Sequence, residues 1–337
     1  MKGTTIAKVA REAGVGVGTV SRVLNGSPAV RADTRRRVLA AIDVLDYEPS
    51  PAARALSTGR TNAVGVVAPF FTQPSVIERL RGVSRTVAGG GFQLVLHDLE
   101  RPEQKQGLFR ILAAHGGVDG LLSISLSPTD DDAHRLQAAG VPIVLIDRHH
   151  PTLPCITIDD VEGGRLAAEH LLGLGHRRIA FLGDEEANQF GFDSSACRRE
   201  GFEAALAAAG APLAPECSLR RPHGPDAARG AASELLALEP RPTAVFATSD
   251  VQAIGVLEAA HAAGIAVPEE LSVIGFDDVE AAEYTGLTTV AQPLDESGAL
   301  GAELLLRALS GEAVESRRMP LAIIERATTA RRVGAVA

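Results

Sequence analysis

Apolar residues near the start of the chain recur at the three- and four-residue spacing of amphipathic helices. The first run predicts a helix over about residues 5–12, which Thr5 can cap and which Gly14 can end in a turn. A second run begins near Val17, and a third predicts a helix over about residues 32–45. Two short helices joined by a glycine-containing turn predict a helix-turn-helix, with the third helix packed against the first two.

From about residue 63 onward, the pattern changes to short apolar runs that alternate with helical segments. Such runs are typical of parallel strands covered on both faces, so the alternation predicts an α/β fold with doubly wound sheets. We expect a helix after each of the first four strands, and eight strands fit two sheets better than one. The predicted strands are 64–67, 93–96, 120–124, 143–146, 156–158, 179–182, 244–246 and 271–274.

Charge is distributed unevenly along the chain. The 337 residues carry a net charge of -9, but residues 1–60 hold ten Lys or Arg against five Asp or Glu. The first sixty residues therefore carry +5 and the remainder -14. A basic head on an acidic body is typical of a protein whose head binds a polyanion. A small basic surface that happens to be N-terminal would give the same charges.

The composition excludes several kinds of protein. The longest uncharged stretch, between Arg60 and Glu78, has 17 residues and two prolines, whereas a membrane-spanning helix needs about 20 mostly apolar residues. The charged N-terminus lacks the apolar run of a secretory signal, and the three cysteines form no C-x-x-C pair. We therefore expect a cytoplasmic protein with no membrane span, no disulfide framework and no thiolate metal site.

The sequence contains no familiar motif for catalysis or cofactor binding. No G-x-S-x-G elbow, Walker A loop or H-E-x-x-H motif occurs. Glycines at 14, 16 and 18 imitate a dinucleotide fingerprint, but they follow a predicted helix and not a strand. We expect no catalytic residues, no metal and no cofactor.

The second predicted helix contains the candidate residues for reading DNA. In a helix-turn-helix this helix lies in the major groove, with its N-terminal side chains at the base edges. Val17, Gly18 and Arg22 occupy those positions, and arginine can bond to guanine while valine can touch a thymine methyl group. The arginines at 35–37 are placed to meet phosphates, which position a protein but carry no sequence information. The other expected DNA-binding residues of the head are Thr5, Thr19, Ser21 and Asn25.

Longer strings in these helices resemble a known family. The chain reads TIAKVAREAGV at 5–15, TVSRVLNG at 19–26 and TRRRVLAAI at 34–42, which resembles the head of the lac and galactose repressor family. The resemblance implies a homodimeric transcriptional regulator, a repressor, that binds a palindromic operator in double-stranded DNA. Two positions differ: Gly16 replaces a serine that usually contacts phosphate, and Arg31 replaces a capping serine.

A short helix is predicted immediately after the head. Ser50 can cap it, and Pro51 suits its first turn. Isolated helices this short are marginal in water, so we expect it to form only when something stabilises it. The resemblance implies that two such hinge helices pair across a dimer and enter the minor groove, with Ala53 on the contacting helix and Leu56 wedged between base steps. An ordinary interdomain linker is the alternative.

The rest of the chain resembles the periplasmic-binding-protein-like effector domain of the same repressors. Strings that support this include GLGHRRIAF at 173–181 and SVIGFDD at 272–278. The implied organisation is a helix-turn-helix head at 1–48, a hinge at 49–61, and an effector-binding and dimerisation domain at 62–330, with lobes formed by 62–160 with 290–320 and by 161–289 with 321–330.

A small-molecule effector, sugar-like or another polar metabolite, is expected between the lobes. Ligands of open parallel sheets bind beyond the carboxyl ends of the strands, where carboxylates can accept bonds from hydroxyls and arginines can bind oxygen-rich groups. Many relatives carry an aromatic residue near 225, where this chain has Pro225 with His223 beside it. The expected effector-binding residues are Phe71, Ser125, Asp147, Arg148, Arg198, Ser249, Asp250 and Asp277.

Two other functions stay open on the sequence alone. A soluble solute-binding protein would share the two lobes but would not bind DNA. An α/β enzyme with an N-terminal helical appendage would share the fold and would turn over its ligand. The same polar residues could instead form salt bridges that close the lobes on each other.

Overall fold

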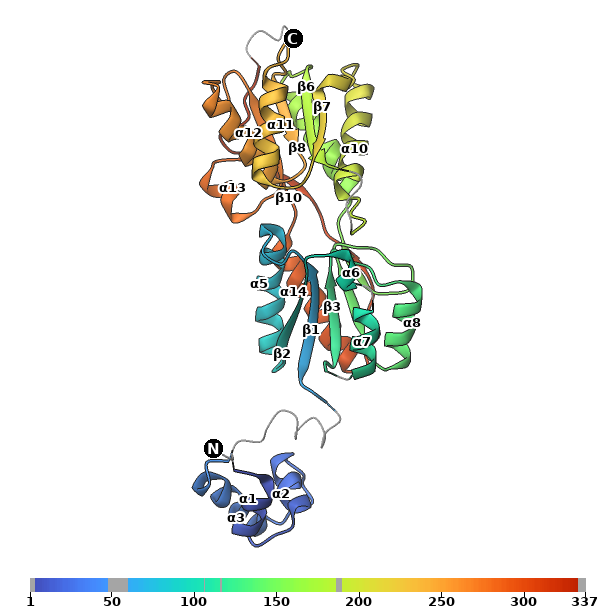
Figure 1. The fold of residues 1–337 in the computed structure, drawn as a ribbon, viewed down its shortest axis with the longest axis vertical. Helices are drawn as coiled ribbons and strands as arrows, with labels where there is room; N and C mark the ends of the chain where they lie inside the picture. Colours follow the sequence, from blue (N-terminus) through green and yellow to red (C-terminus); the bar gives the residue numbers. More distant parts are fainter. Residues whose placement is uncertain (1–3, 48–59, 106, 116, 186–189, 333–337) are drawn as a thin grey trace.

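The computed structural model describes residues 4–47, 60–105, 107–115, 117–185 and 190–332. Figure 1 shows a three-helix head and two α/β lobes in these ranges. The predicted hinge helix, with Ala53 and Leu56, lies outside the described residues. None of the helices in these ranges is both long and apolar enough to cross a membrane.

The head consists of α1 (Ile6–Glu12), α2 (Val17–Leu24) and α3 (Ala32–Val44), which confirms the predicted helix-turn-helix. Val9, Val20 and Val38 are fully buried, one from each helix, because the apolar faces meet in a single small core. Gly14 adopts φ +62° in the turn, as predicted. Thr5 occupies the N-cap position, but its side chain makes no capping hydrogen bond, so the predicted cap is wrong.

Two arginines of α3 bond within the head. Arg37 Nη2 donates to the carbonyl oxygen of Ala13 at 2.6 Å, and Arg35 Nη2 donates to the carbonyl oxygen of Ser27 at 2.6 Å. Ala13 is the C-cap residue of α1, where helix carbonyls lack internal partners, and Ser27 lies in the loop between α2 and α3. Each arginine therefore holds a loop of the head, and the phosphate contacts that we expect of residues 35–37 stay a prediction.

The first lobe is a six-stranded sheet with all paired strands parallel, in the order β11-β5-β4-β3-β1-β2. α5 and α14 cover one face, and α7 and α8 cover the other. The strands are β1 (Ala63–Pro69), β2 (Gln93–Leu99), β3 (Gly120–Ile124), β4 (Ile143–Ile146), β5 (Cys155–Thr157) and β11 (Arg317–Arg318). The helices are α5 (Pro74–Gly89), α6 (Pro102–Lys105), α7 (Leu108–His115), α8 (Asp130–Ala138) and α14 (Leu294–Leu309).

The second lobe is a six-stranded sheet in the order β12-β10-β9-β8-β6-β7, in which only the β10–β12 pair is antiparallel. α11 and α12 cover one face, and α9 and α10 cover the other. The strands are β6 (Ile179–Asp184), β7 (Ser218–Arg221), β8 (Ala244–Ala247), β9 (Ser272–Asp277), β10 (Thr288–Ala291) and β12 (Ala322–Ile324). The helices are α9 (Asp160–Gly173), α10 (Ser194–Ala208), α11 (Pro225–Leu236), α12 (Asp250–Ala262), α13 (Glu280–Tyr284) and the 3-10 turn η1 (Pro215–Cys217).

The predicted α/β class with two doubly wound sheets is confirmed, and all eight predicted strands are present. The chain passes between the lobes three times, after β5, after β10 and after β11. Two details differ from the prediction. No helix follows β4, because residues 147–154 form an irregular connection that contains Pro151 and Pro154. β10 belongs to the second sheet as far as Ala291, two residues beyond the predicted boundary at 289.

Candidate functional site

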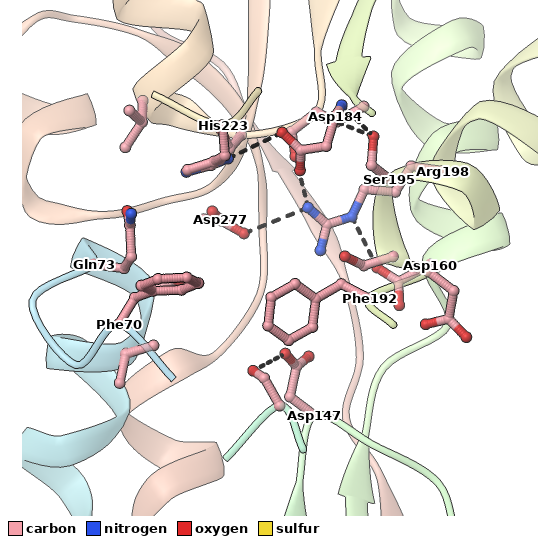
Figure 2. Close-up of a pocket in the computed structure, with 18 of the residues that line it drawn as sticks. Phe70, Gln73, Asp147, Asp160, Asp184, Phe192, Ser195, Arg198, His223 and Asp277 are labelled. Carbon is pink, nitrogen blue, oxygen red and sulfur yellow. Dashed lines mark hydrogen bonds and ion pairs between the residues drawn. The ribbon is translucent and has the colours of Figure 1, made fainter. Parts of the chain in front are cut away.

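A cavity of about 450 Å³ lies between the two lobes. Many of its lining residues end or follow β1, β3 and β4 of the first lobe and β6, β7, β8 and β9 of the second, and others come from α5 and α10. The cavity therefore occupies the carboxyl ends of both parallel sheets, where such folds bind ligands. Figure 2 shows charged side chains from both lobes directed into it, with aromatic rings among them.

Arg198 is the buried cation of the second lobe's wall. Its Nε donates to Asp160 Oδ1 at 2.8 Å, its Nη1 donates to the Thr248 carbonyl oxygen at 2.6 Å, and Nη1 lies 3.7 Å from Asp277 Oδ1. The guanidinium also stacks on the Phe276 ring, 3.5 Å from its centroid. Burial acts to lower the pKa of Arg198, but the neighbouring carboxylates outweigh it and hold the pKa above its ordinary value.

Three carboxylates of the second lobe's wall keep an oxygen available. Asp160, Asp184 and Asp277 each accept hydrogen bonds at Oδ1, and no described residue donates to their Oδ2 atoms. Burial raises the pKa of Asp160 and of Asp277, although Arg198 acts in the opposite direction on both. A ligand that donates hydrogen bonds would relieve this desolvation, so the wall favours hydroxyl or amine groups.

The first lobe contributes a second buried arginine. Arg79 Nη2 lies 3.0 Å from Asp147 Oδ1 and donates to Gln292 Oε1 at 2.9 Å, while Ser125 Oγ donates to Asp147 Oδ2 at 2.7 Å. Gln292 in turn donates from Nε2 to Asp277 Oδ1 at 2.6 Å. Because Gln292 follows β10, on a crossover between the lobes, its amide joins the charged groups of both walls.

His223 extends the polar wall at its rim. Its Nδ1 lies 3.1 Å from Asp184 Oδ1, which also accepts from Gln252 Nε2 at 2.9 Å. Burial acts to lower the pKa of His223, but the bond to Asp184 and the charges of Asp184 and Asp277 raise it above its ordinary value. The imidazole is therefore a further donor beside the carboxylates.

Residues 190–193, here named the aromatic arm, reach from the second lobe's chain onto the first lobe. Phe190 and Phe192 pack against the first lobe's core, and the Phe190 ring meets the Phe70 ring edge-on at 5.3 Å. Phe190 and Phe192 stack at 5.7 Å between centroids. Arg148 of the first lobe pairs with Asp193, which fixes the far end of the arm.

Six of the eight expected effector-binding residues line the cavity: Ser125, Asp147, Arg148, Arg198, Ser249 and Asp277. Phe71 does not line it, because β1 runs to Pro69 and Phe70 turns into the cavity at φ +48°. Phe71 is exposed, and its backbone N–H donates to Asp98 Oδ1 at 3.3 Å. The expectation for Phe71 is therefore wrong by one residue.

Asp250 is also wrongly assigned to the cavity. It is fully buried at the start of α12, where Oδ1 accepts from Thr289 Oγ1 at 2.6 Å and Oδ2 accepts from the Val279 N–H at 2.9 Å. Burial raises the pKa of Asp250 to about 8. Ser249 has a structural role besides lining the cavity, because its Oγ accepts from the Gln252 N–H and caps α12.

The predicted DNA-binding residues of the head have different exposures. Val17, Gly18 and Arg22 are exposed on α2, opposite the buried Val20 and Val23. Their position leaves them available to a partner in a groove. Thr5 and Asn25 are also exposed, whereas Thr19 and Ser21 are half-buried.

Comparison with known proteins identifies the chain. Residues 5–50 match the family described as bacterial regulatory proteins, lacI family, and residues 168–329 match the periplasmic binding protein-like domain. The chain is 34% identical to the HTH-type transcriptional regulator DegA of Bacillus subtilis, over 88% of each protein. The chain belongs to the lacI family. It is also 32% identical to catabolite control protein A of Priestia megaterium, over 93% of this chain and 94% of that protein.

Solved structures of lacI-family proteins share the whole architecture. The complex of the regulator CelR with cellobiose is 33% identical, with a TM-score of 0.69 over 96% of this chain and 99% of that one. The lac repressor dimer bound to operator and the anti-inducer ONPF is 27% identical, with a TM-score of 0.83 over 98% of this chain and 100% of that one. This lacI-family chain is a DNA-binding transcriptional regulator, as the sequence predicted, and not a solute-binding protein that lacks a head.

Proposed function

We propose that this regulator is a cytoplasmic repressor that acts as a homodimer on a palindromic operator in double-stranded DNA. The proposed units are the head at 1–48, the hinge at 49–61 and the effector-binding body at 62–330. The exposed face of α2 supports DNA reading by Val17, Gly18 and Arg22, since all three are exposed. The remaining proposed DNA contacts are Thr5, Thr19, Ser21, Asn25, Ala53 and Leu56.

The proposed effector is a carbohydrate that binds in the cavity, is not converted and changes the affinity of the heads for the operator. The observation that carries this proposal is the wall of three carboxylates, each with an available Oδ2 atom, beside the buried Arg198. Polyhydroxyl ligands offer many donors to such acceptors. Two similar structures, of CelR with cellobiose and of an Enterococcus faecium regulator with ribose, contain sugars.

The proposed homodimer rests on the edge strand β2. Leu94, Val95 and Leu96 are 36%, 36% and 37% exposed on a strand that, among the described residues, pairs with β1 alone. An apolar edge strand is a site for association with another chain. A second copy of this chain that covers β2 would bury these side chains.

A thermal-shift screen of sugars tests the effector class. A ligand that binds only the folded protein raises its melting temperature. We expect at least one mono- or disaccharide to raise the Tm of the wild type but not that of Asp277→Asn, which removes a cavity carboxylate with little change in shape. The matched control is Asp278→Asn, because Asp278 pairs with Arg326 outside the cavity lining. Failure of every sugar to shift the wild type would reject the proposed class.

A further inference from the structure

The aromatic arm places apolar surface opposite the polar wall. Phe70, Phe190 and Phe192 all line the cavity, and the three rings form a continuous series across the boundary between the lobes. Figure 2 shows the Phe192 ring between Asp147 on one side and Asp277 with Arg198 on the other. A ligand in this cavity therefore meets carboxylate oxygens and an aromatic ring together.

The position of these rings differs from the position expected by resemblance. The family resemblance implies an aromatic side chain near residue 225, where this chain has Pro225 at the start of α11. The rings come instead from the connection between β6 and α10 and from the end of β1. Between β7 and α11 the cavity is lined by the polar side chain of His223, which bonds to Asp184.

We propose that Phe192 is a specificity-determining residue that binds the apolar C–H face of a sugar in its ring form, with Phe190 as its positioning residue. The proposal rests on the proposed carbohydrate function and adds the form of the sugar. A pyranose ring presents C–H groups on a face and hydroxyls at its edge, which matches one aromatic ring beside Asp160 and Asp277. An open-chain alditol has the same donors but no fixed apolar face.

Phe190 holds Phe192 in place through contacts on two sides. It stacks on Phe192 at 5.7 Å and meets Phe70 edge-on at 5.3 Å, so it lies between the arm and the first lobe. The pair of Arg148 with Asp193 anchors the next residue of the arm. These contacts orient the Phe192 ring before a ligand arrives, which reduces the entropy lost on binding.

A tryptophan reporter tests whether the ligand touches the arm. The chain contains no tryptophan, so Phe192→Trp introduces a single fluorophore that keeps an aromatic face. The probe is the sugar that gives the largest Tm shift with the wild type. We expect it to change the emission of Phe192→Trp and not that of Phe71→Trp, an exposed neighbour of the cavity that does not line it. Bound sugar without any change at position 192 would overturn the proposal.

Calorimetric titrations test the specificity. Loss of one ring contact in Phe192→Ala should weaken binding of that sugar about 3- to 10-fold, while Phe71→Ala stays within about twofold of the wild type. The wild type should bind the corresponding alditol more weakly than the sugar. Phe190→Ala should weaken sugar binding, and Phe190→Tyr, which keeps the stacked ring, should restore it.

The outcomes separate this proposal from the function on which it rests. Equal affinity for sugar and alditol, or an unchanged affinity in Phe192→Ala, would reject the role of the arm while sugar binding stands. If no sugar shifts the wild-type Tm, the carbohydrate function fails first and this proposal fails with it.

Discussion

At the residue scale, Arg198 is the group on which the cavity's charge balance depends. It lies within bonding or ion-pair distance of Asp160 and Asp277 and is itself buried. Buried carboxylates without a cation are strongly unfavourable, so the loss of Arg198 should lower the stability of the fold as well as ligand affinity.

We predict that Arg198→Ala destabilises the protein by about 3–5 kcal/mol and abolishes the Tm shift by sugar, since it leaves two carboxylates uncompensated. Urea denaturation with and without sugar measures both effects. The control is Arg165→Ala, which removes exposed pairs with Glu162 and Glu169 on α9 and should cost about 0–1 kcal/mol. Equal denaturation midpoints for the two variants would contradict this account.

Asp250 gives a prediction of pH dependence. Its pKa is raised from 3.8 to about 8 by burial, so between these values the folded state keeps a proton that the unfolded state releases. The stability from this proton is present at low pH and is lost as pH rises towards 8. Between pH 5 and pH 8, the Tm of Asp250→Asn should therefore fall less than the Tm of the wild type. The control is Asp226→Asn, which removes an exposed pair with Arg229 on α11 and should follow the wild type. A wild-type pH dependence in Asp250→Asn would refute the shift.

Some site residues could be predicted from the sequence and others could not. Asp147 and Asp277 end apolar strands, and strand ends of parallel sheets meet at one edge. Asp250 also follows a strand, but whether a side chain there faces the cavity or the core depends on the first turn of the next helix. Arg79 and Phe192 come from a helix and a connection with no pattern of their own, so only the folded structure brings them to the cavity.

At the element scale, the strength of the hydrophobic pattern decided what could be predicted. Strands such as β3 and β8 are wholly buried and read as unbroken apolar runs. β7 was not predicted, because it is a half-buried edge strand whose sequence, Ser218–Arg221, includes two arginines. No helix forms after β4, because Pro151 and Pro154 disfavour one, and the pattern of apolar residues does not reveal this effect.

Arg36 and Arg37 of α3 provide a test variant and a matched control for the stability of the head. Arg37 donates to the carbonyl at the end of α1, whereas Arg36 makes an exposed ion pair with Asp33. We predict that Arg37→Ala destabilises the head by about 1.5–3 kcal/mol, through the loss of a charged hydrogen bond. Limited proteolysis of the head in the full chain, followed over temperature, measures this.

Arg36→Ala should leave the proteolysis temperature of the head almost unchanged. If both variants become susceptible at the same temperature, Arg37 does not hold the turn.

At the scale of the whole molecule, the dimer can be tested through β2. We predict that Leu96→Lys gives a monomer in light scattering, because it places a charge in the apolar edge that a second copy would cover. Affinity for a palindromic operator should fall, and affinity for a half-site should not. Val161→Lys is the control, since Val161 on α9 is equally exposed at 37%. A Leu96→Lys dimer would place the interface elsewhere.

The central claim is that a ligand between the lobes changes how the heads hold DNA. Coupling of two sites typically changes affinity by about 5- to 150-fold. The direct test is an anisotropy titration of the full chain on a palindromic operator, selected by the wild type from random sequences, with and without the sugar that raises its Tm. We predict an operator affinity that changes with sugar in the wild type and is insensitive to sugar in Asp277→Asn. A sugar that binds the wild type and leaves its operator affinity unchanged would contradict the account.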